Sequence, residues 1–298
     1  MTPPRVGFHT GAFNTAYFSF PKALGWGAEH GLRGIECGFV DGVTWNHGLG
    51  YFPHLASWED PRQVAGELAA RGVTLSQIDA AFPISGPLGP TVGVPYVLNT
   101  IRWAALAGCR MVDTTDGLHK PSQISEAEAM RMMRESYRQI MEVAERYEIV
   151  VNIETHGYFT SHPDRMAEML SFVDSPYLRM TFDTGNVFIA GEDPVAFLKR
   201  HIDAVAHVHL KDVAPGLAQE QRGKQTGIGM SHVPIGGGVN AENIRSCLRM
   251  LKDHGYVGAV SLECDAMGGP LLEESIRWVR ETLDTLEYTH DMQDSTDE

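Results

Sequence analysis

Residues 150–157 read "VVNIETHG", a short run with strand-forming side chains that ends on a carboxylate and an imidazole. Valine and isoleucine favour strands because their branched side chains fit a pleated surface. Successive side chains of a strand alternate between its two faces, so Glu154 and His156 are expected to face the same side. An otherwise apolar strand thus ends on two ionisable groups, and similar strand ends follow further along the chain.

Short apolar runs alternate with stretches of helical period along the whole sequence. The predicted strands are residues 5–9, 34–38, 73–79, 111–115, 149–154, 178–183, 204–211 and 258–263. The predicted helices are residues 23–30, 61–71, 94–107, 126–147, 163–173, 194–199, 241–254 and 271–286. Proline in the first turn of "SHPDRM" and "EDPVAF", and a serine cap in "SEAEAM", mark three of the helix starts. The alternation predicts repeated strand–helix units around a parallel sheet.

The number and size of these units favour a closed barrel. The 298 residues divide into eight units of about 37 residues each, the size of a (β/α)8 barrel. The main rival is an open doubly wound sheet, but the first strand–helix turn, "HTGAFN", lacks GxGxxG, and "GKQTGIG" does not have the order of a P-loop. We predict an α/β protein with a single-domain (β/α)8 TIM barrel over residues 1–286 and a polar, acidic C-terminal tail over residues 287–298.

Composition excludes several classes of protein. A formal net charge of −14 argues against a nucleic-acid partner, because phosphate backbones are bound by clustered Lys and Arg. The four cysteines contain no CxxC pair, so neither a thiolate metal site nor a disulfide framework is indicated, and a reducing compartment fits. The start "MTPPRVGFHTG" has no apolar signal core, and no window approaches the roughly 20 apolar residues of a membrane span. We expect a cytoplasmic protein with no membrane partner.

Ionisable residues end four of the later predicted strands. After Glu154 they are Asp183 in "RMTFDTGN", His207 and His209 in "VAHVHLKD", and Glu263 in "AVSLECD". In a barrel of this kind the functional groups lie at the C-terminal ends of the strands, where they share one mouth. Any one of them alone is equally well explained as a hydrogen-bonded residue at a loop entry. Together, oxygen and nitrogen donors without a thiolate suit a divalent metal, and without a metal the crowded carboxylates would cost stability.

These motifs carry a resemblance to a known family. "NIETHG", "TFDTGN", "HVHLKD", the "VPIGGGVN" turn and "GYVGAVSLEC" resemble the xylose isomerase-like TIM-barrel superfamily. That superfamily includes sugar isomerases and epimerases, inosose dehydratases, dehydroshikimate dehydratases and the endonuclease IV group. The resemblance covers nearly the whole chain. It implies a divalent metal, Mn²⁺ first, with Mg²⁺, Co²⁺ or Zn²⁺ as alternatives, held by Glu154, Asp183, His209 and Glu263.

The sequence also departs from branches of this superfamily. Asn186 stands where several relatives have a histidine three residues after the aspartate, which argues against DNA repair. Lys211 follows the strand-end histidine where ketose 3-epimerases bring an arginine near the substrate, so epimerase specificity stays open. His156, two residues after Glu154, resembles the histidine that serves as a proton-transfer base in the dehydratase and keto-sugar lyase branches.

Roles for the remaining residues follow from their places at strand ends. The predicted catalytic residues are Glu154, His156, Glu263 and Lys211. The predicted substrate contacts are His9, Glu36, Asp79, Asn186 and Lys211, with Asp113, Trp45 and His47 as further candidates and Phe13, Trp45 and Phe82 as stacking groups or core residues. Three alternatives stay open: His156 as a packing histidine, Lys211 as a solvent lysine, and His207 as a histidine packed beneath the metal.

The segment 212–240 carries seven glycines, at positions 216, 223, 227, 229, 236, 237 and 238. Its length and composition suit a lid or a subunit contact, and a plain disordered loop is the alternative. We expect a homo-oligomer, and an accessory subunit would fit the same segment.

The reaction class follows from what a metal and two glutamates can do. A divalent ion beside a carbonyl makes an enediolate accessible, and two carboxylates can then remove and return a proton. The first interpretation is a metal-dependent isomerase or epimerase of a keto sugar or keto-cyclitol. The alternative is a dehydratase or lyase that uses His156 as base for β-elimination from an inosose or a 3-keto-glycoside, including C-glycoside cleavage. A catalytically silent sugar-binding barrel has no use for a complete ligand set.

Overall fold

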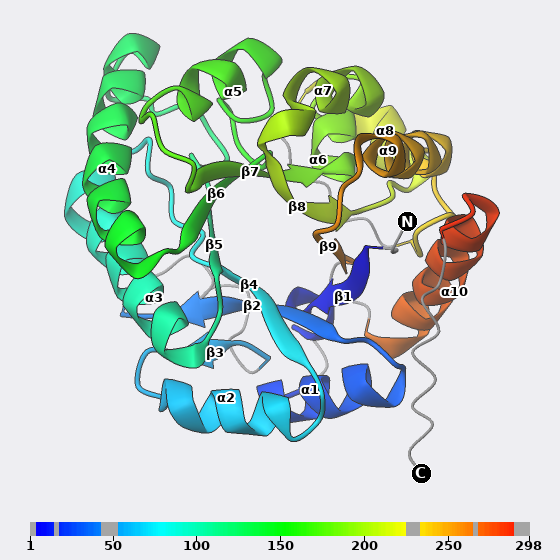
Figure 1. The fold of residues 1–298 in the computed structure, drawn as a ribbon. Helices are drawn as coiled ribbons and strands as arrows, with labels where there is room; N and C mark the ends of the chain where they lie inside the picture. The colour runs from blue at the N-terminus through cyan, green and yellow to red at the C-terminus, as the bar shows by residue number, and fades with distance from the viewer. Residues whose placement is uncertain (1–3, 15–17, 43–52, 225–232, 265–267, 289–298) are drawn as a thin grey trace.

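The computed structural model describes residues 4–14, 18–42, 53–224, 233–264 and 268–288. Parallel strands form a closed barrel in the centre of the molecule (Figure 1). Their order is β1-β9-β8-β7-β6-β5-β4-β2, and the pairing of β1 with β2 closes the barrel. The barrel strands are β1 (Arg5–His9), β2 (Gly34–Val40), β4 (Thr74–Asp79), β5 (Met111–Thr114), β6 (Val150–Glu154), β7 (Leu178–Asp183), β8 (Val205–Leu210) and β9 (Ala259–Leu262).

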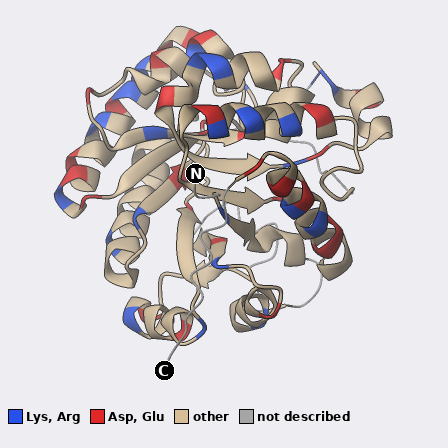
Figure 2. Cartoon of the chain, turned by 45° about the vertical axis from the view of Figure 1, so that its right-hand side comes forward, with Lys and Arg blue, Asp and Glu red and all other residues tan. Residues whose placement is uncertain are grey.

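Helices form a ring outside these strands (Figure 1). They are α1 (Phe20–Glu29), α2 (Pro61–Ala69), α3 (Val94–Ala107), α4 (Glu126–Tyr147), α5 (Pro163–Leu170), α6 (Thr184–Ile189), α7 (Pro194–His201), α8 (Pro215–Gln221), α9 (Ala241–His254) and α10 (Gly269–Thr285). The predicted α/β class and single-domain (β/α)8 TIM barrel are confirmed. Figure 2 shows Lys and Arg interleaved with Asp and Glu along the outer helices.

Strand alternation decides which side chains enter the barrel. On β6, Val151 and Ile153 are fully buried in the hydrophobic core between strands and helices. Asn152 points the other way, since its amide donates to the side chain of Gln77 on β4 at 2.5 Å. Glu154, two residues on, shares the inward face with Asn152. The apolar face of the strand therefore packs against the helices, and its polar face lines the interior of the barrel.

The helix starts follow the local chemistry read from the sequence. Ser125 caps α4 in a capping box: its hydroxyl accepts from the Glu128 amide at 3.3 Å, and the Glu128 carboxylate accepts from the Ser125 amide at 2.9 Å. Proline occupies the first turn of α5 and α7. These contacts satisfy backbone N–H groups that have no partner within the helix.

Some elements differ from the prediction. The short strand β3 (Leu55–Ala56), which pairs with the end of β2 outside the barrel, was not predicted, nor were α6 and α8. Helix α6 begins directly at the end of β7, where the Asp183 carboxylate accepts from the Gly185 and Asn186 amides at 2.7 and 2.8 Å. The helical pattern is too short there to be read from periodicity.

One residue of the predicted polar tail packs against the barrel. Tyr288, placed in the polar tail by its sequence, is only 3% exposed and donates its hydroxyl to the Leu248 carbonyl on α9 at 3.3 Å. Residues 289–298 of the predicted tail, like Trp45 and His47, lie outside the described residues. Within the described part of the chain, no helix is both long and apolar enough to cross a membrane.

Candidate metal centre

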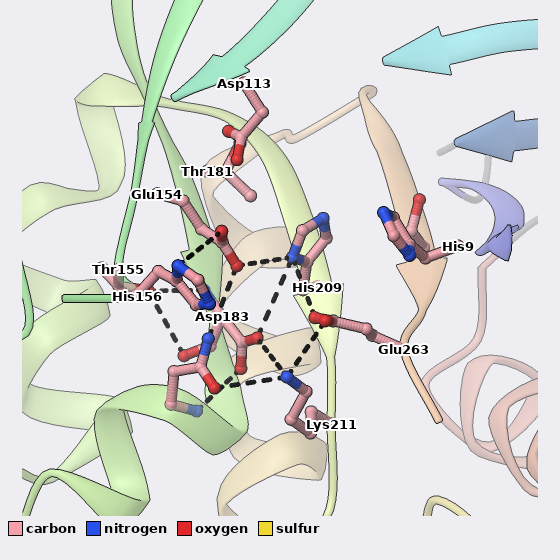
Figure 3. A network of polar contacts seen from close by, with 12 residues as sticks. His9, Asp113, Glu154, Thr155, His156, Thr181, Asp183, His209, Lys211 and Glu263 are labelled. Carbon is pink, nitrogen blue, oxygen red and sulfur yellow. Dashed lines mark hydrogen bonds and ion pairs between the residues drawn. The ribbon is translucent and has the colours of Figure 1, made fainter. Parts of the chain in front are cut away.

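Four predicted ligands come together at the C-terminal mouth of the barrel. Glu154 ends β6, Asp183 ends β7, His209 lies near the end of β8, and Glu263 follows β9. One donor atom from each lies within 4.8 Å of the others. Figure 3 shows these side chains turned toward one another from neighbouring strands. Because β6, β7, β8 and β9 are consecutive in the barrel, Glu154 and Glu263 are the two outer members of the group.

His209 is the centre of this group. Its Nδ1 lies 3.1 Å from both Glu154 Oε1 and Glu263 Oε2 and 3.9 Å from Asp183 Oδ2. Its Nε2 faces the opposite way and lies 2.9 and 3.0 Å from the two oxygens of Glu36. A neutral His209 with its proton on Nε2 therefore presents the Nδ1 lone pair to the three carboxylates. A ring nitrogen fixed by a carboxylate behind it is the usual arrangement of a metal-binding histidine.

Glu36 does not have the place that the sequence prediction gave it. It was predicted to touch substrate, but it lies inside the barrel with no exposed surface, where it accepts from His209 and lies 3.0 Å from His207 Nε2. Burial opposes its charge, but the two imidazoles outweigh burial and hold the pKa of Glu36 well below its usual value. His207 also contacts Ser261 at 2.9 Å, so it packs beneath the centre as the alternative interpretation expected. Glu36 thus fixes the predicted ligand His209 from inside the barrel.

Two carboxylate oxygens at the centre accept no hydrogen bond from the described residues. They are Asp183 Oδ2 and Glu263 Oε2, both buried. Each nonetheless faces a nitrogen, since Lys211 Nζ lies 3.4 Å from Asp183 Oδ2 and His209 Nδ1 lies 3.1 Å from Glu263 Oε2. Burial raises the pKa of Asp183 well above its usual value, against the opposing charge of Lys211. Burial also disfavours the charged form of His209, but Glu36 and Glu263 outweigh it and raise the pKa of His209 well above its usual value. Protons thus compensate the crowded carboxylates here, and a divalent cation fits the same oxygen and nitrogen donors.

Lys211 and Asn186 complete the buried charge network. Lys211 Nζ lies 3.1 Å from Glu263 Oε1 and 3.4 Å from Asp183 Oδ2, and it donates to Asn186 Oδ1 at 3.3 Å. Asn186 in turn donates to Glu154 Oε1 at 3.4 Å. Lys211 is 1% exposed, which contradicts the solvent-lysine alternative. Both residues orient predicted ligands, and their predicted contact with substrate stays a prediction.

His156 lies beside Glu154. Its Nδ1 is 3.8 Å from Glu154 Oε2 and 3.1 Å from the Thr115 hydroxyl at the end of β5. Burial lowers the pKa of His156 below its usual value, against the nearby charge of Glu154. A neutral imidazole at this position is able to accept a proton.

A buried clamp that the sequence did not reveal holds the His156 backbone. The Thr160 hydroxyl accepts from the His156 and Gly157 amides at 3.0 and 2.8 Å and donates to Asp116 at 2.8 Å. Asp116 also accepts from the Phe159 amide at 2.6 Å. Burial raises the pKa of Asp116 to about 6, although these hydrogen bonds favour its carboxylate form. The only sequence signal was "HGYFT", in which a threonine follows the glycine turn.

Replacing Thr160 by valine should lower the free energy of unfolding by about 1–3 kcal/mol, because the isosteric side chain removes a hydrogen-bond partner from two buried N–H groups and from the Asp116 carboxylate. Urea unfolding at constant m-value measures the change. Thr285→Val is the matched control: its hydroxyl donates to the Glu281 carbonyl at an exposed helix end, so a change within about 0.5 kcal/mol is expected. Equal stability of Thr160→Val and the wild type would contradict the clamp.

His9 and Asp79 lie at the ends of β1 and β4. His9 Nε2 is 3.8 Å from Asp79 Oδ2, and the rings of His9 and His209 are 6.2 Å apart between centroids. Their predicted contact with substrate stays a prediction. His54, which the sequence analysis missed, joins them: its Nδ1 accepts from the Gly38 amide at 3.0 Å, and the pKa of this buried ring is lowered to about 3.

Other candidates lie in the interior. Asp113 accepts from the Thr181 hydroxyl at 2.6 Å inside the barrel and is 1% exposed, so it supports the centre from below. Phe13 packs in the core against Phe8 and Trp26, with ring centroids 6.0 and 5.3 Å away. Phe82 is likewise buried, so of the two alternatives for these rings the structure favours core packing.

A parallel barrel with ionisable groups gathered at its C-terminal mouth has the general form of a barrel enzyme. The family model of the xylose isomerase-like TIM barrel matches residues 24–282, and the chain belongs to this family.

Two curated relatives are enzymes of different reaction classes. The inosose dehydratase of Clostridium beijerinckii is 23% identical over 211 residues, which cover 68% of this chain and 60% of the relative. The L-ribulose-5-phosphate 3-epimerase of Escherichia coli K12 is 24% identical over 172 residues, which cover 57% of this chain and 55% of the relative. The matches thus span little more than half the length of these relatives.

A solved structure shares the fold over nearly the whole chain. The IOLI protein with a bound zinc atom has a TM-score of 0.69 and 12% identity, and the match covers 95% of this chain and 97% of that protein. At this identity the similarity shows the fold.

Proposed function

We propose that the protein is a divalent-metal-dependent isomerase or epimerase of a keto sugar or keto-cyclitol and acts through an enediolate. The observation that supports this most strongly is the orientation of His209, whose Nδ1 faces three carboxylates while Glu36 fixes its Nε2. Asp183 Oδ2 and Glu263 Oε2, which are buried and accept no hydrogen bond from the described residues, are further oxygen donors for the same cation. Mn²⁺ is the first candidate, with Mg²⁺, Co²⁺ and Zn²⁺ as alternatives that suit the same donors.

The metal, when bound, acidifies the carbon beside a substrate carbonyl. Side chains of the protein then transfer the proton. Glu154 and Glu263 enter from opposite ends of the row of four strands, so one can remove a proton and the other can return it. Lys211 holds Glu263 through a 3.1 Å ion pair, and Asn186 holds Glu154 by a hydrogen bond. These contacts fix both carboxylates before substrate arrives.

A second candidate is a dehydratase or lyase with His156 as the base. The position of His156 favours it: the ring lies beside Glu154 yet opens toward a separate cavity. In that reaction His156 would take the proton from the carbon beside the carbonyl, and a group on the next carbon would leave. The dehydratase and epimerase relatives support both outcomes from one family of sites.

Substrate panels in D₂O distinguish these reactions and test the metal. The Mn²⁺-loaded protein should place deuterium on a carbon beside the carbonyl of a ketohexose, an inosose or a 3-keto-glycoside, and NMR reads the product. Deuterium without a lost group supports the isomerase or epimerase, and loss of water or aglycone supports the lyase. EDTA should abolish the exchange, and added Mn²⁺ should restore it. Full exchange in a protein shown by elemental analysis to be metal-free would contradict the proposal.

For partners, we propose a small sugar or cyclitol and no nucleic acid. The interleaved charges on the outer helices and the net charge of −14 support this, because a phosphate backbone requires a continuous basic surface. We also propose that the protein forms a homo-oligomer.

A further inference from the structure

A cavity lies beside the metal centre, at the same end of the barrel. It has a volume of about 420 Å³ and is formed by the loops after β4 and β5 together with His156 after β6. Thr115 and His156 mark its end toward the centre, since Thr115 contacts His156 and His156 lies 3.8 Å from Glu154. Cavities of this size commonly hold small ligands. One that shares His156 with the centre is placed to hold part of the same substrate.

The cavity is preformed. The loop after β5 is joined by backbone hydrogen bonds to the loop after β4, from the Ser85 amide to the Asp116 carbonyl at 3.1 Å, and to the segment after β6, from the Tyr158 amide to the Gly117 carbonyl at 3.1 Å. Gly117 has a φ of +110°, and a Cβ at that position would lie 2.8 Å from the Pro83 Cβ. The close approach of the loops therefore requires glycine at this position. Preformed walls reduce the entropy cost of binding a rigid group.

The walls are mostly apolar. Pro83, Pro87, Leu118 and Pro121 form most of their surface, and polar groups are added by the buried Ser85, Thr115 and His156 and by the exposed Ser122 and Gln123. Proline and leucine offer flat, rigid apolar surface without hydrogen-bond donors for a sugar hydroxyl. Such a surface favours a ring or another apolar group over a second sugar unit.

A phosphate fits this cavity poorly. The basic lining residues are His119, Lys120 and His156. Lys120 Nζ lies 3.6 Å from Glu126 Oε1, so its charge is already compensated. An anionic sugar would therefore meet mostly apolar surface at the cost of its hydration.

We propose that this cavity is a subsite for an apolar ring joined to the sugar, so that the substrate is a sugar with an apolar aglycone. The inference rests on the proposed function and names its substrate class: the sugar lies over Glu154, Asp183, His209 and Glu263, and the ring passes His156 into the cavity.

Calorimetry on the wild-type protein with three probes tests the subsite without turnover. Phenyl glucoside should bind about tenfold more tightly than methyl glucoside, because the cavity removes a ring from water. Glucose 6-phosphate should bind no better than methyl glucoside. Equal affinity for phenyl and methyl glucosides, or a preference for the phosphate, would overturn the subsite.

Three variants test whether the phenyl ring binds in this cavity. Leu118→Asp should abolish the preference for phenyl glucoside, because it places a carboxylate in the apolar wall. Ser122→Trp, at the exposed rim, should abolish it by filling the cavity and guards against a folding defect at Leu118. Leu106→Asp is the matched control: Leu106 is 54% exposed on α3, outside the lining, and should keep the preference. A preference retained in both cavity variants would mean that the ring binds elsewhere and would overturn the proposal.

The two proposals can fail separately. The metal-dependent proton exchange in D₂O tests the chemistry with a free keto sugar, whereas the calorimetry requires no reaction. A preference for the ring without proton exchange would support the subsite and contradict the enzyme proposal. Proton exchange without a preference for the ring would support the enzyme proposal and contradict the subsite.

Discussion

Glu263→Gln is expected to lower turnover by about 10²- to 10⁴-fold and to reduce the bound metal. Glutamine keeps the shape of the side chain but removes the negative charge that Glu263 directs at His209 and Lys211, each 3.1 Å away. Metal sites require deprotonated ligands, so the loss of one anionic donor weakens binding. The rate falls further because an amide cannot return a proton, and a positioned acid or base is worth this factor.

Elemental analysis and the exchange rate in D₂O measure the two effects of Glu263→Gln. Glu274→Gln is the matched control, since Glu274 is exposed on α10 and its replacement should change neither quantity. A Glu263→Gln protein with full metal content and a rate within tenfold of the wild type would remove Glu263 from both roles.

His156→Ala is expected to retain metal while turnover falls by about 10²- to 10⁴-fold, if His156 is the base of the lyase reaction. Glu154 still provides its ligand atom, because His156 Nδ1 lies 3.8 Å from Glu154 Oε2 and His156 is not part of the group of four predicted ligands. In the epimerase reaction the two glutamates carry the proton. The same variant would then bind substrate modestly less well and keep most of the exchange.

His162→Ala is the matched control for His156→Ala. His162 precedes α5 in the same loop, is exposed, and makes no side-chain capping hydrogen bond. Its replacement should leave the rate unchanged. If neither His156→Ala nor Glu263→Gln slows exchange by more than about tenfold, both mechanisms are wrong and the base comes from an earlier strand, where His9 and Asp79 lie.

The sequence located the predicted ligands at strand ends, but only the tertiary structure shows how deep in the barrel each strand end lies. Glu154, Asp183, His209 and Glu263 could be located because each follows a short apolar run, and parallel strands bring such ends together. Glu36 follows the same pattern, yet it lies under the centre. The inward tilt and depth of a strand end depend on how the strand is staggered in the barrel, and β2 and β4 pair with a register shift next to Glu36.

Strand–helix periodicity and the four late motifs by themselves determined the barrel, its family and the identity of the candidate ligands, since these are local patterns. Only the tertiary structure decided which atoms meet. The Glu36 support of His209, the Asp116–Thr160 clamp and the cavity beside His156 join residues 173, 44 and 41 positions apart in the chain. Such contacts arise from the closure of the barrel and the packing of its loops, which no local sequence pattern encodes.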